Sequence, residues 1–159
     1  YTLADVINAG CRDGELDVRG VSHRGYFASI TDFKSYHDAN MDLIDYKTAT
    51  DLFHDNWPIY TRTNNSCPTH YFDTANVSNS VISNGSMIEG TVENSIVGRG
   101  CTIKKGAVIK NCVVLADCTI GENVHIENLV VDKHAKITHA KEIIRPAGEP
   151  GYIKRNDTL

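Results

Sequence analysis

The spacing of aliphatic residues from about Ala75 to Ile137 predicts a parallel β-helix. In this region an Ile or Val recurs mostly every five or six residues, whereas an α-helix repeats every 3.6 residues and a strand every two. Two positions before these residues the chain usually carries a small side chain, which fits inside a tight corner between short strands. We therefore expect triangular coils, each of three strands, stacked about 4.8 Å apart. The inward residues are Ile82, Ile88, Val92, Val97, Ile103, Ile109, Val114, Ile120, Ile126, Val131 and Ile137.

A longer period of seventeen residues marks the length of one coil. Val97 recurs as Val114 and again as Val131 at this spacing. Asparagine tolerates the left-handed backbone conformation that tight corners need, and stacked asparagine side chains can bond to one another along a ladder. We expect such a ladder at one corner of the coils, formed by Asn79, Asn94, Asn111 and Asn128.

Residues 1–74 show no six-residue pattern and are expected to mix helices with short strands. An amphipathic stretch predicts a helix that ends at Gly10. The segment from Val18 to Ile30 has the composition of a strand, and Asp32 is a suitable N-cap for the helix that follows. Ile59–Thr61 is predicted to be another short strand.

Composition excludes several classes of protein. The chain has 159 residues, of which 41% are hydrophobic and 23% charged, which is ordinary for a globular protein. Its net charge of -4 gives no reason to expect nucleic acid as a partner, since that would need a basic face. The apolar runs are too short to cross a membrane, and the first residues do not have the pattern expected of a signal peptide. The five cysteines form no C-x-x-C pair, which favours reduced thiols and a cytoplasmic location. Because the chain starts at Tyr1, we expect a piece of a longer protein.

The handedness of the β-helix is implied by a resemblance. Parallel crossovers are right-handed in nearly all folds, but the six-residue steps resemble the hexapeptide-repeat family, whose β-helices are left-handed. The expected fold class is therefore mainly β, a left-handed parallel β-helix preceded by a small α+β segment.

A second resemblance is more specific and joins the repeats to the preceding segment. Gly25-Tyr26-Phe27 and the helix containing Ala39-Asn40-Met41-Asp42-Leu43 resemble the domain junction of bacterial glucose-1-phosphate adenylyltransferases (ADP-glucose pyrophosphorylases). Trp57-Pro58-Ile59-Tyr60-Thr61, Cys67-Pro68-Thr69-His70-Tyr71-Phe72 and Val92–Gly100 resemble the strand, β-helix entry and first coils of the same family. The resemblance implies that residues 1–24 are the tail of the catalytic domain, 25–74 a strand-helix-strand linker and 75–159 the β-helix with C-terminal strands.

The resemblance also implies a function. The family forms ADP-glucose from ATP and glucose 1-phosphate with magnesium, in glycogen biosynthesis. Ser29 falls where catalytic members carry an aspartate that holds the metal, and a neutral hydroxyl is a weaker magnesium ligand. Asp32 lies three positions later, where helix capping is its expected role. We therefore expect no catalytic residue or metal site in this chain, and a non-catalytic regulatory subunit of the D type. Local drift in an active enzyme is the alternative.

The expected partners are a catalytic subunit of the same family, a second copy of the chain, or both, and magnesium is implied for the catalytic partner. Arg62, His70 and Arg145 are the candidate contacts for a sugar-phosphate effector, and ordinary solvated charge is the alternative interpretation of these residues.

Two other functions stay open from the sequence. Hexapeptide acyltransferases use a coil histidine, for which His125, His134 and His139 are the candidates, but a long loop is absent and His125 should point outward. A catalytically active sugar nucleotidyltransferase of another specificity would carry a related β-helix. Cys101 and Cys118 share one corner on adjacent coils, within reach of a disulfide, yet that corner requires small residues and free thiols are expected.

Overall fold

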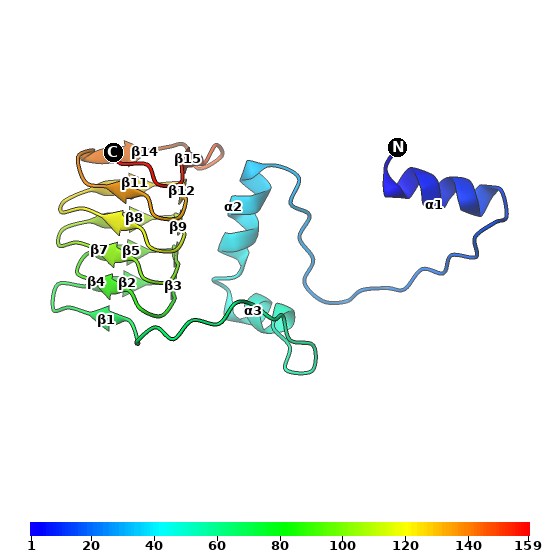
Figure 1. The fold of residues 1–159 in the computed structure, drawn as a ribbon, viewed down its shortest axis with the longest axis horizontal. Coiled ribbons are helices and arrows are strands. Elements are labelled where there is room, and N and C mark those ends of the chain that lie inside the picture. Colours follow the sequence, from blue (N-terminus) through cyan, green and yellow to red (C-terminus); the bar gives the residue numbers. More distant parts are fainter.

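The computed structural model describes residues 1–159. It consists of a triangular β-helix that is preceded in the sequence by three helices (Figure 1). The fifteen strands form three parallel sheets of five strands each. Sheet 1 contains β1 (His70–Tyr71), β4 (Met87–Ile88), β7 (Thr102–Ile103), β10 (Thr119–Ile120) and β13 (Lys136–Ile137). Sheet 2 contains β2 (Asn76–Ser78), β5 (Thr91–Glu93), β8 (Val108–Lys110), β11 (His125–Glu127) and β14 (Glu142–Ile144). Sheet 3 contains β3 (Val81–Ile82), β6 (Ile96–Val97), β9 (Val113–Val114), β12 (Leu129–Val131) and β15 (Gly151–Ile153).

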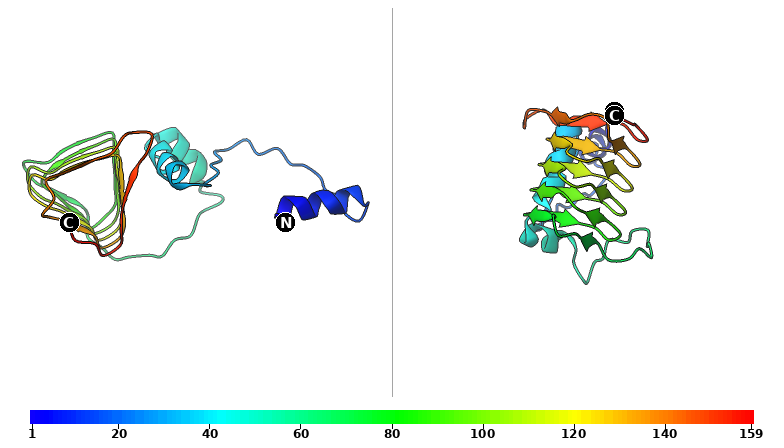
Figure 2. Two further views of the ribbon diagram at one scale, coloured as in Figure 1. Left: turned by 90° about the horizontal axis from the view of Figure 1, so that it is seen from above. Right: turned by 90° about the vertical axis from the view of Figure 1, so that its left-hand side faces the viewer.

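The path of the chain confirms the predicted fold class. Each coil visits sheets 1, 2 and 3 in turn, and equivalent strands of successive coils pair in parallel. Seen with the C-terminal end toward the viewer, the chain runs clockwise as it approaches, so the β-helix is left-handed (Figure 2).

The interior of the prism is formed by the predicted aliphatic residues. Ten of the eleven are fully buried, and Ile82 in the first coil is partly buried and packs against them. Each inward side chain lies on its equivalent in the next coil, as Ile103 pairs with Ile88 on one side and Ile120 on the other. Small side chains such as Cys101, Cys118 and Ala135 fill the corners and are also buried. Burial of each aliphatic side chain contributes about 1.5–3 kcal/mol to stability.

The asparagine corner follows the prediction in both backbone and side chain. Asn79, Asn94, Asn111 and Asn128 all have positive φ, between 41° and 55°. The amide of Asn79 donates to Oδ1 of Asn94 at 2.8 Å, and Asn94 donates to Oδ1 of Asn111 at 3.2 Å. Asn111 donates to Asn128 in the same way. The ladder therefore satisfies the amides of one corner along the whole stack.

The β-helix extends beyond the aliphatic pattern at both ends. Strand β1 precedes the expected start near Ala75, since its Tyr71 pairs with Ile88. The prediction missed this strand because Tyr71 is aromatic and the pattern was defined by aliphatic residues. At the other end, β14 and β15 continue sheets 2 and 3 after the six-residue pattern stops. The last residues add to sheet 1, where Thr158 pairs in parallel with Lys136.

The N-terminal segment contains helices α1 (Leu3–Arg12), α2 (Phe33–Asp42) and α3 (Tyr46–Leu52). The helix predicted to end at Gly10 continues to Arg12, and Asp13 is its C-cap. Asp32 is the N-cap of α2 as predicted, since its carboxylate accepts a hydrogen bond from the backbone N–H of Ser35 at 2.7 Å. None of these helices has the length and apolar character needed to span a membrane.

The two strands predicted in the N-terminal segment are not formed. Residues 18–30 and 59–61 are extended but have no neighbouring strand, so they are not part of a sheet. Strand structure requires a hydrogen-bonded partner as well as a suitable composition, and the composition of these segments could not show that the partner is missing.

We predict that Ile120→Asp or Ile103→Asp abolishes folding. A carboxylate at either position is enclosed between neighbouring coils, and burying an unpaired charge costs several kcal/mol out of a typical total of about 5–15 kcal/mol. The control is Thr119→Asp, one residue earlier on the outer surface. Soluble expression and thermal unfolding measure the effect; a soluble Ile120→Asp protein with a normal melting transition would disprove the assignment of the core.

The asparagine ladder allows its two contributions to be separated. Asn111→Ala removes the ladder bonds and forces alanine into a left-handed conformation, with an expected loss of about 2–3 kcal/mol in the free energy of unfolding. Asn111→Gly removes the same bonds without that strain and should lose about 1 kcal/mol. Chemical denaturation measures both, and equal losses would mean that backbone strain at this corner is unimportant.

Candidate functional site

The outer surface of sheet 3 is the position at which the N-terminal segment joins the β-helix. Its strands place aliphatic residues on the outside as well as the inside: Val113 and Val130 lie next to the inward Val114 and Val131, and all four are buried. Helix α2 lies along this surface and contacts β9 (Figure 1). The sequence contains a signal for this contact that the prediction did not use. Paired aliphatic residues follow the asparagine in each coil, whereas the outer positions of the other sheets are mostly polar.

Helix α2 is fixed to the ladder corner by a buried histidine. His37 is only 2% exposed, and its Nε2 lies 2.9 Å from the backbone oxygen of Asn111. Since a carbonyl can only accept, Nε2 carries the hydrogen in this bond. Nδ1 has no hydrogen-bond partner, and the nearest charged atom is Oδ1 of Asp38 at 3.6 Å. His37 is the most buried residue of the helix, and nothing in the sequence indicated this contact.

The N-terminal end of α2 is tied to the last coil of the β-helix. The ring of Phe33 meets that of Tyr152 edge-on, with centroids 5.7 Å apart. The hydroxyl of Tyr152 donates to Oδ2 of Asp132 at 2.7 Å, and this bond lowers the pKa of Asp132 and raises the pKa of Tyr152. A chain of contacts therefore links the helix to two successive coils.

The C-terminal end of α2 is tied to the segment that precedes it. The hydroxyl of Tyr26 donates to Oδ2 of Asp42 at 3.0 Å. Partial burial and the Asp42 carboxylate raise the pKa of Tyr26. This contact holds residues 26–30 across the side of α2 that faces away from the β-helix.

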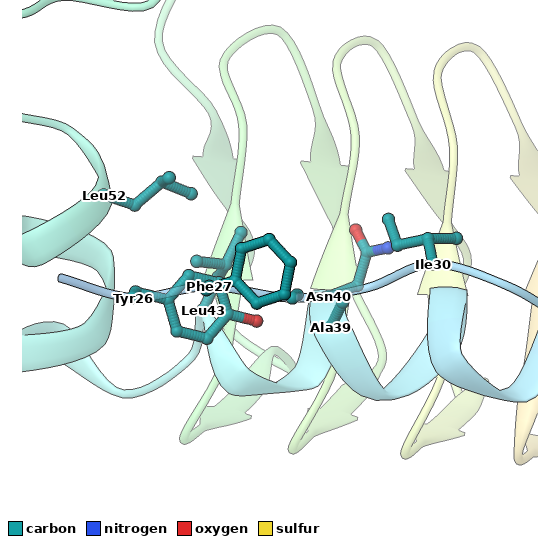
Figure 3. A pocket seen from close by; sticks show the side chains of 8 residues that line it. Tyr26, Phe27, Ile30, Ala39, Asn40, Leu43 and Leu52 are labelled. Carbon is teal, nitrogen blue, oxygen red and sulfur yellow. The ribbon is translucent and has the colours of Figure 1, made fainter. Parts of the chain in front are cut away.

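An open apolar groove of about 440 Å³ lies on that far side of α2 (Figure 3). It runs between the helix and the extended segment, and Leu52 of α3 closes one end. Phe27 is 78% exposed and Ile30 is 58% exposed, which is unusual for side chains of this size on a folded surface. The groove is lined by Tyr26, Phe27, Ala28, Ile30, Ala39, Asn40, Leu43 and Leu52.

Ser29 lies in the extended segment beside this groove and is exposed. Asp32, three positions later, is the N-cap of α2 through its Oδ1, and that bond with Ser35 lowers the pKa of Asp32. No group of three or more His, Cys, Asp or Glu side chains is arranged to hold a metal ion. These residues do not fit a magnesium site.

The three predicted effector contacts do not meet at one place. His70 is on β1 in the first coil, and its ring packs edge-on against Phe72. Arg62 lies near the second coil, where its backbone oxygen accepts a bond from Arg99 at 2.9 Å. Arg145 follows β14 in the last coil, and β14 is four strands from the first coil in sheet 2, or about 19 Å. Within one chain Arg145 therefore does not share a site with Arg62 and His70, and anion binding by each of the three residues stays a prediction.

Two of the three histidines considered for acyl transfer, His125 and His134, lie beside carboxylates on the surface. His125 points outward as predicted, with Nε2 2.7 Å from Glu127 and Nδ1 3.8 Å from Glu142. His134 lies 3.7 Å from Asp117. The coils are joined by tight corners, and no long loop brings a substrate-sized cavity to these residues.

The cysteines in the coils fill space and do not form disulfides. Cys101, Cys112 and Cys118 are buried and free. Burial raises the pKa of Cys112 to about 12. A hydrogen bond to Cys118 and burial raise the pKa of Cys101 far above its usual value. The reactive form of cysteine is the thiolate, so Cys101 and Cys112 are unreactive at neutral pH.

Comparison with known proteins agrees with this architecture. Residues 68–145 match the family model described as GlmU-like, C-terminal hexapeptide. The chain is 42% identical over 86 residues to glucose-1-phosphate adenylyltransferase from Geobacillus stearothermophilus, covering 54% of the chain and 22% of the relative. It is 36% identical over 122 residues to the enzyme of the same name from Bacillus mycoides (strain KBAB4), covering 77% and 32%.

A relative with a different name matches more of the chain. The glycogen biosynthesis protein GlgD from Bacillus subtilis (strain 168) is 36% identical over 140 residues, covering 88% of the chain and 41% of the relative. The chain thus spans 22–41% of the length of these three relatives. The chain is a homologue of the C-terminal part of glucose-1-phosphate adenylyltransferases and of GlgD, built on the hexapeptide-repeat β-helix.

Proposed function

We propose that the chain is the assembly and regulatory part of a glucose-1-phosphate adenylyltransferase subunit that acts in glycogen biosynthesis and does not itself catalyse the reaction. The observation that carries the proposal is the joint between α2 and sheet 3. One side of α2 is fixed to the β-helix by His37 and Phe33, while the other side forms an empty apolar groove. Such a helix can connect two folded bodies rigidly.

The remaining part of the same subunit is the proposed occupant of the groove. The relatives are more than twice as long as the matched region, so a large part of the subunit lies outside this chain. Residues 18–30 have strand composition but no partner strand, and the end of this segment, from Tyr26 to Ile30, forms one wall of the groove. A sheet in the missing part would pair with this segment and cover Phe27 and Ile30.

The non-catalytic role rests on the chemistry around Ser29. A catalytic subunit would need anionic oxygen ligands for magnesium, and this chain offers a neutral hydroxyl at that position and a neighbouring carboxylate already used for helix capping. We propose that a catalytic subunit of the same family supplies the metal site. A sugar-phosphate effector that acts through Arg62 and His70 remains part of the proposal.

The full-length subunit should show little ADP-glucose formation alone and should change the activity or effector response of a co-expressed catalytic subunit. The measurement is initial rate with ATP, glucose 1-phosphate and magnesium, for each subunit and for the pair. Ser29→Asp in the full-length chain tests whether a carboxylate restores some activity. A rate for the unmodified subunit alone equal to that of the catalytic subunit would refute the non-catalytic role.

The proposed occupant of the groove is tested by one substitution in two contexts. Phe27→Asp should change the free energy of unfolding of the 159-residue chain by less than about 0.5 kcal/mol, because the side chain is exposed there. In the full-length subunit the same substitution should cost about 3 kcal/mol or more, since it buries a charge. Tyr46→Asp, on α3 outside the groove, is the control. Equal effects of Phe27→Asp in both contexts would show that the groove stays open.

A further inference from the structure

The three outer surfaces of the β-helix differ in what occupies them. Sheet 3 is covered by α2. Sheet 2 carries charged pairs, including Lys110 and Glu93 at 3.3 Å and His125 with Glu127. Sheet 1 carries neither a packed helix nor an ion pair between its strands. The helices lie beside a different face of the triangular prism (Figure 2). We call the outer surface of sheet 1 the bare face.

Two rows of outward side chains make up the bare face. Neighbours in the first row are set by the strand register and include Met87 and Thr102. The second row stands one residue past the end of each strand and includes the neighbours Glu89 and Lys104. Backbone bonds continue there, as the N–H of Glu89 donates to the oxygen of Ile103 at 2.8 Å. In the order of the strands, the first row is His70, Met87, Thr102, Thr119 and Lys136, and the second is Phe72, Glu89, Lys104, Gly121 and Thr138.

The composition of the bare face suits contact with another protein surface. Met87 is 46% exposed and Phe72 is 40% exposed, so apolar area is open to solvent at the first two strands. Glu89 and Lys104 are the charged residues at its centre, and neither forms an ion pair within the chain. Gly121, in the second row, carries no side chain and is buried against the backbone of the next coil.

We propose that the bare face docks onto the bare face of a second copy of this chain, with the two β-helices antiparallel. The two-fold axis would run parallel to the strands, between β4 and β7. This symmetry reverses the order of the strands but keeps each position along a strand, so first-row residues face first-row residues. The proposal refines the assembly role proposed above and relies on it only for the premise that the chain assembles.

The pairing that follows from this axis brings opposite charges together at its centre. Glu89 of one copy faces Lys104 of the other, and the two-fold axis produces this ion pair twice. Phe72 faces Gly121, which has no side chain to oppose the ring, and Met87 faces Thr102. All of these positions follow from the register of sheet 1.

Other registers of the same arrangement are less favourable. An axis through β7 places Lys104 opposite Lys104, and like charges in contact oppose association. An axis between β7 and β10 places Lys104 opposite Gly121 and leaves Glu89 without a cation. A second copy is therefore a specific partner for the bare face, in one register.

The size of the bare face sets the strength to expect. Four paired strands span about 19 Å along the stack, which gives less area than the roughly 800 Å² per partner of a standard interface. The contact should therefore be weak and transient in isolation. Because its ion pairs are near solvent, association should weaken as salt rises.

A charge exchange tests the proposed register. Sedimentation velocity of the protein at concentrations up to about 1 mM and at low salt should show a monomer–dimer equilibrium. Glu89→Lys and Lys104→Glu, each alone, should weaken the dimer at least about tenfold, because each creates like-charge contacts across the axis. The double variant should restore the dimer to within about threefold of the unmodified protein, since each pair is re-formed with reversed signs.

Matched controls come from sheet 2. Glu93→Lys and Lys110→Glu make the same changes in net charge and also place like charges on neighbouring strands of one chain. They should leave the dimer unchanged within about threefold. Circular dichroism of each variant verifies that the β-helix is intact.

Three outcomes would overturn the proposal. The protein could remain monomeric at the highest concentration, the single variants on sheet 1 could associate as the unmodified protein does, or the double variant could fail to recover. Association that persists in Glu89→Lys would assign the contact to another surface. None of these results depends on nucleotidyltransferase activity, so failure of this proposal and failure of the proposed function are distinguishable.

Discussion

The stacking of one inward aliphatic side chain on its equivalent in the next coil is the interaction on which the rest of the structure depends. Strands of two or three residues cannot form a stable sheet by themselves. In this chain each strand is secured by an inward Ile or Val, such as Ile103 between Ile88 and Ile120, and by hydrogen bonds to the coils on either side. The repeat length follows, because the chain must turn every five or six residues to bring the next aliphatic residue inward.

The corners impose a second requirement that packing alone does not meet. A chain that turns so tightly needs left-handed backbone conformations, and most side chains resist them. Asn94, Asn111 and Asn128 accept the conformation and bond to one another along the stack. The same corner supplies the carbonyl of Asn111 that receives His37, so the ladder both closes the coils and anchors the helix.

The outward residues give the three faces of the same scaffold different roles. On sheet 3, aliphatic residues such as Val113 and Val130 receive α2 and make it rigid relative to the β-helix. On sheet 2, ion pairs such as Lys110 with Glu93 keep the surface solvated. A helix fixed to the β-helix on one side and open on the other is suited to transmit the position of the β-helix to an attached body. This is the physical basis of the role proposed for the chain in assembly and regulation.

The sequence by itself determined the β-helix, because its periods of six and seventeen residues fit no other regular structure and local sterics at the asparagine corners act within each coil. It also determined the Asp32 cap, which is a contact between near neighbours. The tertiary structure alone decided which outward residues are covered, since the pairs Ile96-Val97 and Val113-Val114 do not show what packs on them. It separated Arg145 from Arg62 and His70, and it left residues 18–30 without a sheet. These outcomes depend on contacts between parts of the chain that are far apart in sequence. Composition and periodicity describe near neighbours in sequence and do not predict such contacts.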